Sequence, residues 1–155
     1  MAYLFLVRSR ARVVNTPCIS LAVITASLVL ASAAYADAGS FSTLKSATSF
    51  AIGGVGVAGV TTPEELAMRA IRDSPRAEEQ LWKLLREGTP AGQMYALFAL
   101  RQLGTANYTA LSQPYRRSST PVRVISGCII HTDPMSDVVR WIDQWAQQIR
   151  TWEKT

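Results

Sequence analysis

The chain has 155 residues, a formal net charge of +5 and two cysteines. Three of its 16 basic residues and Cys18 lie within the first 36 residues, so the remainder has 13 basic against 11 acidic residues, a net charge of +2, and only Cys128. This small charge excess argues against a nucleic-acid-binding surface, and the single cysteine excludes an intramolecular disulfide.

The first 36 residues have the pattern of an export signal. Three arginines precede an apolar, uncharged stretch at residues 19–34, and Ala34 and Ala36 supply the small side chains that a signal peptidase accepts. We expect cleavage after Ala36, which places the mature protein in the periplasm or outside the cell. A retained anchor is the alternative, but the apolar run is too short and too interrupted to span a bilayer, so we expect no membrane span after cleavage.

The next two segments differ in composition. Residues 37–49 are rich in Ser, Ala and Thr without a hydrophobic period, which predicts a flexible leader. Residues 50–60 are apolar and rich in glycine, which favours a short extended segment or tight loop over a helix. The glycines at 54–59 have the spacing of a dinucleotide-binding motif, but the next helix start is delayed to Pro63, and no cofactor is expected.

Four predicted helix starts share one sequence pattern, a residue with an oxygen-bearing side chain followed by proline. The oxygen can accept a hydrogen bond from an unpaired amide of the first turn, and proline at the first position has no amide hydrogen to leave unpaired. At the first start Glu65 also completes a capping box with Thr62. A shorter helix is expected at residues 106–112. The four starts predict helices at residues 63–73, 75–87, 90–103 and 134–152, of which the third is apolar almost all round and is expected to be the buried centre.

Residues 122–130 are rich in β-branched side chains and predict a single strand. On this strand Cys128 shares a face with Val122 and Val124, which favours a buried thiol that behaves as a small hydrophobic residue. The only histidine, His131, then precedes the last helix, where Asp133 is expected to be the N-cap.

Cys128 and His131 are the candidate nucleophile and base of a thiol-dependent enzyme. Residues three apart on a strand point to opposite faces, so the two side chains could meet only if the chain turned after Ile129. The two residues and Asp133 are also too close together in sequence for a usual metal site, and no metal is expected.

The candidate partner contacts are aromatic and basic. Trp141 and Trp145 of the last helix are expected to be core residues, whereas Trp152 near its end is a candidate contact, since aromatic anchors are enriched at interfaces. Arg116 and Arg117 form a local basic cluster that is a second candidate, although exposed arginines are commonly only solvated.

The segments at residues 50–56, 88–97 and 126–130 resemble a scattered group of small exported bacterial proteins without an assigned activity. The helices at residues 63–103 are also similar to a HEAT-type repeat pair. The resemblance implies a bacterial envelope protein and carries no catalytic residues with it.

These patterns predict a mainly α fold, a single compact domain of four to five helices at residues 50–155, with a small two-stranded pairing of residues 51–57 with residues 122–129. The leading functional interpretation is a non-catalytic protein-binding module, because stacked helices present grooves and no catalytic set is visible. Its partner is expected to be another envelope or secreted protein. An immunity or inhibitor protein against a secreted toxin or hydrolase is the first alternative, and a thiol-dependent enzyme using Cys128 and His131 is the second.

Overall fold

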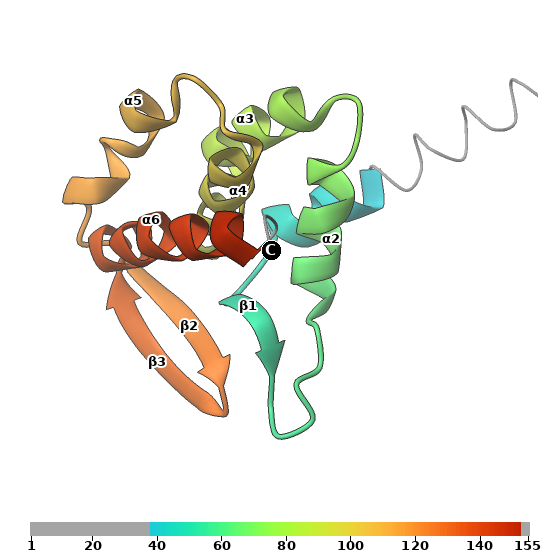
Figure 1. The fold of residues 1–155 in the computed structure, drawn as a ribbon, viewed down its shortest axis with the longest axis vertical. Helices are drawn as coiled ribbons and strands as arrows, with labels where there is room; N and C mark the ends of the chain where they lie inside the picture. The colour runs from blue at the N-terminus through green and yellow to red at the C-terminus, as the bar shows by residue number, and fades with distance from the viewer. Residues whose placement is uncertain (1–37, 153–155) are drawn as a thin grey trace, which may run out of the picture. The chain divides into compact units, whose positions relative to one another are not determined.

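The computed structural model describes residues 38–152, with side chains described as far as Trp145. The described part contains six α-helices and one three-stranded sheet, against which the carboxy-terminal helix packs (Figure 1). None of the described helices is long and apolar enough to cross a membrane. In chain order the elements are a helix at residues 38–45, β1 (Phe50–Val55), α2 (Pro63–Arg72), α3 (Ala77–Glu87), α4 (Pro90–Leu103), α5 (Tyr108–Ser112), the 3-10 helix η1 (Tyr115–Arg117), β2 (Pro121–Gly127), β3 (Ile129–Pro134) and α6 (Met135–Trp152).

The fold is a mixture of α and β structure, so the prediction of a mainly α domain with a two-stranded element is wrong. The sheet has the order β1-β2-β3, in which β1 runs parallel to β2 and β2 runs antiparallel to β3. The expected pairing of residues 51–57 with residues 122–129 is present as β1 and β2, over a shorter length. The sequence pattern misses the third strand because residues 121–134 form a hairpin rather than one strand followed by a helix cap.

Gly127 and Cys128 form the two-residue turn of this hairpin. Gly127 has a φ of +56°, a left-handed conformation that glycine adopts without steric cost at the first position of such a turn. Because of the turn, the side chains that follow it point to the opposite face from the one that a single continuous strand would give them. As a result His131 and Asp133 of β3 lie on the same face of the sheet as the core residue Val122.

The helix α4 is the centre of the core, as its apolar sequence predicts. All residues from Ala91 to Leu100 except Gln93 are buried, and the helix packs against α2, α3 and α6. Gly104 ends it with a φ of +70°, the left-handed conformation expected of a glycine at a helix terminus.

Residues 38–45 form a helix that joins this core, which differs from the flexible leader expected there. Leu44 is fully buried. The start of α4 approaches this helix closely, because the Thr89 amide donates to the Lys45 carbonyl at 3.1 Å and a Cβ on Gly92 would overlap the carbonyl oxygen of Leu44. Glycine is therefore required at this position by the close approach of the two backbones.

Two of the four predicted helix starts have the expected cap. Thr62 and Thr89 each accept a hydrogen bond from an amide three residues ahead, at 3.1 and 3.2 Å, at the starts of α2 and α4. The helix α3 begins at Ala77, later than predicted, without a side-chain cap. The helix α6 begins at Met135. The expected cap Asp133 belongs instead to β3, where its carboxylate pairs with His131.

Candidate functional site

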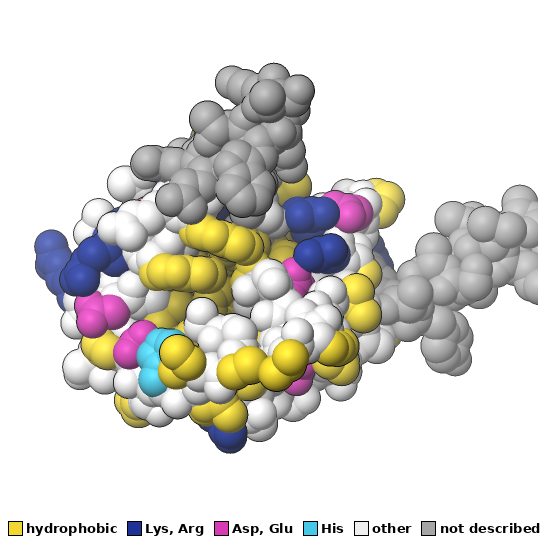
Figure 2. All heavy atoms as spheres, turned by 60° about the horizontal axis from the view of Figure 1, so that its bottom comes forward, with side chains coloured by type: hydrophobic (Ala, Val, Ile, Leu, Met, Phe, Trp, Pro, Cys, Tyr) yellow, Lys and Arg dark blue, Asp and Glu magenta, His cyan; other side chains and the backbone are white. Residues whose placement is uncertain are grey.

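A hollow between the sheet and α6 is the candidate binding site. Its volume is about 220 Å³, and Figure 2 shows hydrophobic side chains in the hollow of this face with a histidine and an acidic neighbour at the rim. It draws residues from all three strands and from one helix. We name it the sheet–helix pocket, and it is lined by Phe50, Ile52, Val124, Ile125, Ser126, His131, Asp133, Val138 and Trp141.

The bend in β1 leaves room for this pocket. Phe50 and Ala51 are in register with β2, but pairing resumes only at Val55. Between them Gly53 and Gly54 have φ angles of +87° and +93°, which side chains with a Cβ rarely adopt. The extended segment that the glycine-rich sequence predicts is therefore confirmed, and its glycines allow the strand to leave its neighbour beside the pocket.

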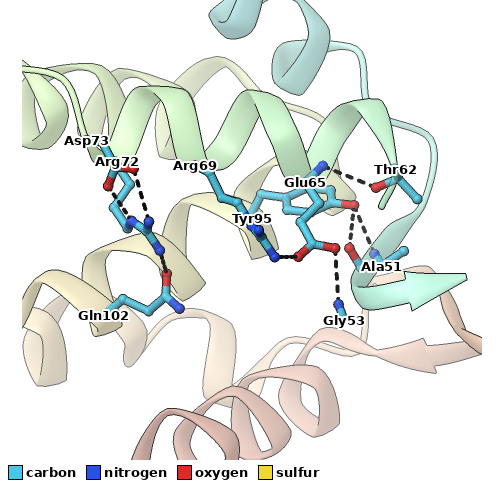
Figure 3. A network of polar contacts seen from close by, with 9 residues as sticks. All are labelled: Ala51, Gly53, Thr62, Glu65, Arg69, Arg72, Asp73, Tyr95 and Gln102. Atoms are coloured by element: carbon cyan, nitrogen blue, oxygen red, sulfur yellow. Dashed lines mark hydrogen bonds and ion pairs between the residues drawn. The ribbon is translucent and has the colours of Figure 1, made fainter. Parts of the chain in front are cut away.

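Side chains from α2 and α4 close the outer edge of β1 (Figure 3). The Tyr95 hydroxyl accepts a hydrogen bond from the Ala51 amide at 2.9 Å and donates one to the Ala51 carbonyl at 3.0 Å. The Glu65 Oε2 atom accepts a hydrogen bond from the Gly53 amide at 3.1 Å. Alternate residues of a strand turn their backbone groups to the same side, so Ala51 and Gly53 both point away from β2. Their groups find buried side-chain partners instead of another strand.

Glu65 has a role that the capping-box pattern does not predict. Its amide is capped by Thr62 as expected, but its carboxylate turns to Gly53 and to Arg69, one turn further along α2 (Figure 3). The residue is only 1% exposed. A buried carboxylate is tolerated here because a guanidinium group and a backbone amide both donate to it.

Tyr95 is the second member of this polar cluster. The hydroxyl of a tyrosine is protonated at neutral pH, and burial raises the pKa of Tyr95 further, to about 12. A protonated hydroxyl can both donate and accept, and Tyr95 does both toward one residue of β1. The cluster of Tyr95 and Glu65 therefore holds β1 in place and is a structural feature.

His131 and Asp133 form the polar rim of the sheet–helix pocket. They are two residues apart on β3, so their side chains share a face, and His131 Nε2 lies 3.0 Å from Asp133 Oδ2. An ionised carboxylate only accepts, so in the neutral imidazole the hydrogen lies on Nε2 and Nδ1 is left as an acceptor. Within the described part of the chain, Nδ1 is shielded from solvent and has no hydrogen-bond partner.

The structure does not bring Cys128 and His131 together. Cys128 is exposed in the hairpin turn, whereas His131 lines the pocket. The prediction of a buried thiol is wrong because the chain turns at Gly127 and Cys128, whereas the sequence analysis considered a turn only after Ile129. Glycine between two β-branched runs was the signal available for this turn.

Trp141 and Trp145 stack on each other along α6, with ring centroids 5.2 Å apart and planes at 16°. Trp145 also contacts the core ring of Phe98 at 5.4 Å and is partly buried. Trp141 meets Phe50 edge-on at 5.9 Å but is 39% exposed, so it is a wall of the pocket rather than a core residue. The candidate Trp152 lies in α6, and its side chain falls outside those that are described.

The two candidate arginines differ in surroundings. Arg116 is only partly exposed, because its Nη2 atom lies 2.6 Å from Asp143 Oδ2 and its Nε atom donates to Ser112 Oγ at 3.1 Å. It therefore connects η1 to α5 and α6. Arg117 is exposed and remains a candidate contact.

The outer edge of β3 is open. In a hairpin with a two-residue turn, the residues that flank the turn bond to each other and every second pair thereafter does the same. Ile130 and Thr132 therefore turn their amides and carbonyls away from β2, and no hydrogen bond from the described residues reaches these groups. The side chains are exposed as well, Ile129 to 67% and Ile130 to 57%.

Two valines extend this exposed apolar surface. Val55 and Val60 exchange backbone hydrogen bonds of 2.9 Å that fold back the loop after β1, and the Gly56 amide donates to the Gly127 carbonyl at 2.9 Å. The loop therefore lies against the hairpin turn, at the same end of the sheet (Figure 1). We name this surface the apolar end, formed by the exposed side chains of Val57, Val60, Ile129 and Ile130.

Comparison of the chain with protein-family models, with curated proteins and with solved structures finds no match. Within the described residues, no three His, Cys, Asp or Glu side chains are grouped so that they could hold a metal ion.

Proposed function

We propose that this chain is an exported, non-catalytic binding module that adds an extended segment of another envelope or secreted protein to the open edge of β3. The observation that carries the proposal is the row of backbone groups at Ile130 and Thr132 that no described residue pairs with, together with exposed isoleucines on the same strand. An exposed edge of this kind is a template for a further strand, which gains main-chain hydrogen bonds on binding.

The surroundings of β3 supply contacts beyond the backbone. Successive residues of an added strand point to the two faces of the sheet in turn. A residue opposite His131 projects to the face that holds the sheet–helix pocket, and its neighbours project to the solvent face beside Ile130. The bound segment is therefore expected to be apolar on the pocket side and near the apolar end.

The export part of the proposal depends on residues 1–36. These lie outside the described residues, so signal cleavage after Ala36 stays a prediction. The partner proposed here is accordingly a protein that meets the chain after export.

A photo-reactive residue on β3 tests strand addition. The full chain is expressed in its host with p-benzoylphenylalanine in place of Ile130, irradiated in cells, and its cross-linked products are identified by mass spectrometry. We expect one defined envelope protein at this position. The same probe in place of Leu66 of α2, another apolar side chain that is 55% exposed, is the control and should not give this product.

Two variants at Thr132 make the test specific for a strand. Thr132→Pro removes an outward amide and blocks the added strand, whereas Thr132→Val retains the amide. Cross-linking should be lost in the first variant and kept in the second. Equal yields in both variants would contradict strand addition, and a product of two copies of this chain would contradict a different protein as the partner. A cross-linked chain that begins at Met1 rather than Asp37 would contradict export.

A further inference from the structure

The two turns that form the apolar end carry no charged side chain. Residues 50–62, which include β1 and the loop after it, contain no Asp, Glu, Lys, Arg or His, and neither do residues 124–130 around the hairpin turn. Four of the seven large hydrophobic side chains that are exposed among the described residues lie in these two segments, and Val57 is 100% exposed. Surface loops are usually polar, so an apolar surface on two adjacent turns indicates a contact with another apolar surface.

The backbone of the apolar end is held by hydrogen bonds within the chain. Val55 and Val60 exchange two bonds of 2.9 Å. The Gly56 amide donates to the Gly127 carbonyl at 2.9 Å and so joins the loop to the hairpin turn. The exposed side chains are therefore presented on one folded unit, which need not become ordered on binding.

The solvent face of the hairpin becomes positively charged behind the turn. Nearest to the turn on this face, Ile125 pairs with Ile130, and the next pair on the same face is Arg123 with Thr132. Arg123 is exposed and is the only charged residue on this face of β2 and β3. Two residues of a strand span about 7 Å. Starting from the turn, the face is thus first apolar and then cationic.

A lipid bilayer has the complementary order of chemistry. Its hydrocarbon core is followed on each side by a headgroup region about 5–7 Å thick, and anionic headgroups attract Arg and Lys near the surface. Figure 1 shows the loop after β1 and the hairpin turn projecting at the same end of the sheet. A fluid bilayer accommodates a projecting surface without a preformed recess, whereas a folded protein would need a recess of matching shape.

We propose that the apolar end inserts into the surface of an anionic lipid bilayer, with its valines and isoleucines against the acyl chains and Arg123 at the level of the phosphates. The contact is shallow and reversible, because even a single myristoyl chain, which offers at least as much apolar surface, binds a membrane only marginally. The lipid meets the two turns, whereas an added strand would pair with the outer edge of β3. Either proposal can therefore fail alone.

A fluorescent probe at Cys128 tests insertion directly. Cys128 is exposed in the hairpin turn, and Cys18 is replaced by serine so that the label has one site. The full chain is expressed in its host, and the isolated product is labelled with nitrobenzoxadiazole and mixed with vesicles of phosphatidylcholine and phosphatidylglycerol in equal parts. We expect a stronger, blue-shifted emission that spin labels on the acyl chains quench. Unchanged emission at saturating lipid would overturn the inference.

A substitution at the tip tests the apolar contribution. Val57→Asp should weaken vesicle binding by about tenfold, because a charge replaces a side chain that enters the acyl region. The folded structure should be unaffected, since Val57 is fully exposed. The matched control is Leu103→Asp at the end of α4, an apolar side chain that is 41% exposed. Equal losses of binding in the two variants would overturn the inference.

A second substitution tests the contact with the headgroups. Arg123→Gln should weaken binding to the anionic vesicles about fivefold and leave binding to vesicles of phosphatidylcholine alone unchanged. The matched control is Arg86→Gln, which changes an exposed arginine of α3, a helix that packs against α2 and α4. An equal effect of Arg123→Gln on both kinds of vesicle would contradict the placement of this residue at the phosphates.

Other occupants of the apolar end give different results. If the emission of labelled Cys128 changes with protein concentration in the absence of lipid, the surface belongs to a second copy of the chain and the inference is overturned. Thr132→Pro, which blocks strand addition, should leave vesicle binding unchanged. A loss of vesicle binding in this variant would mean that the edge of β3, rather than the two turns, meets the membrane.

Discussion

The two outer edges of the sheet have the same backbone chemistry and opposite surroundings. On β1, the outward amides of Ala51 and Gly53 donate hydrogen bonds to Tyr95 and Glu65, both buried, and the Ala51 carbonyl accepts one from Tyr95. On β3, the corresponding groups are not reached by any of the described residues. One edge is therefore part of the core, and the other has no partner within the described part of the chain.

The difference indicates what closing an edge requires. Two helices must deliver buried polar side chains at the spacing of alternate strand residues, and α2 and α4 do this for β1. The common alternative is to protect an edge with charges, bulges or proline. The last residues of β3, Asp133 and Pro134, are of this kind, but the strand begins with two exposed isoleucines and pairs with β2 without a bulge. An exposed edge strand of this kind is typical of sheets to which a partner adds a further strand.

The largest expected effect breaks the closed edge. Tyr95→Phe removes the hydroxyl that satisfies both backbone groups of Ala51 and leaves them buried without a partner. Each such group costs about 1–3 kcal/mol, so for the two groups we expect the free energy of unfolding to fall by about 2–6 kcal/mol in a urea titration.

Tyr115→Phe is the matched control, since its hydroxyl donates to a single carbonyl, that of Leu85, at 3.2 Å and is only partly buried. Its loss should cost about 1 kcal/mol or less. Equal losses in the two variants would contradict the view that Tyr95 closes the edge of β1.

Alkaline pH should weaken the same edge by a smaller amount. The pKa of Tyr95 is raised by burial from 10.0 to about 12, so below pH 10 the residue is protonated in both states and contributes its full stability. Between pH 10 and pH 12 the unfolded chain releases this proton while the folded chain keeps it, and unfolding becomes easier as pH rises. The expected loss from Tyr95 is about 1.4 kcal/mol at pH 11.

Other tyrosines titrate in the same range, because burial also raises the pKa of Tyr108 and Tyr115. The quantity to measure is therefore the difference between the pH dependence of the wild type and that of Tyr95→Phe, from urea titrations at pH 9 and pH 11. Parallel curves for the two proteins would show that Tyr95 does not titrate differently on folding.

The helices could be predicted because their signals are local. Capping threonines before Pro63 and Pro90 mark two helix starts, and the predominantly apolar sequence of α4 marks the centre of the core. The edge of β1 could not be predicted in this way. Glu65 fits a local capping motif, but its carboxylate instead accepts a hydrogen bond from the Gly53 amide, and this contact depends on where the bend of β1 lies in space.

The candidate site illustrates a missed local signal and its consequences. Gly127 separates two β-branched runs, and treating 122–130 as one strand buries Cys128 and hides β3. Once the hairpin is recognised, the spacing of two residues between His131 and Asp133 places them on one face. The pocket beside them was beyond sequence analysis, because it depends on α6 and on β1 leaving β2.

The smallest expected effect on stability is that of a substitution at the edge of β3, which is compared with Tyr95→Phe at the edge of β1. Thr132→Pro removes an amide that has no partner among the described residues, and proline is tolerated at such outward positions of edge strands. The free energy of unfolding should change by about 1 kcal/mol or less, well below the loss in Tyr95→Phe. Urea titrations of this variant and of Thr132→Val measure the effect of the missing amide. A loss in Thr132→Pro as large as that in Tyr95→Phe would mean that the Thr132 amide is paired in the folded protein, and the two edges would then not differ.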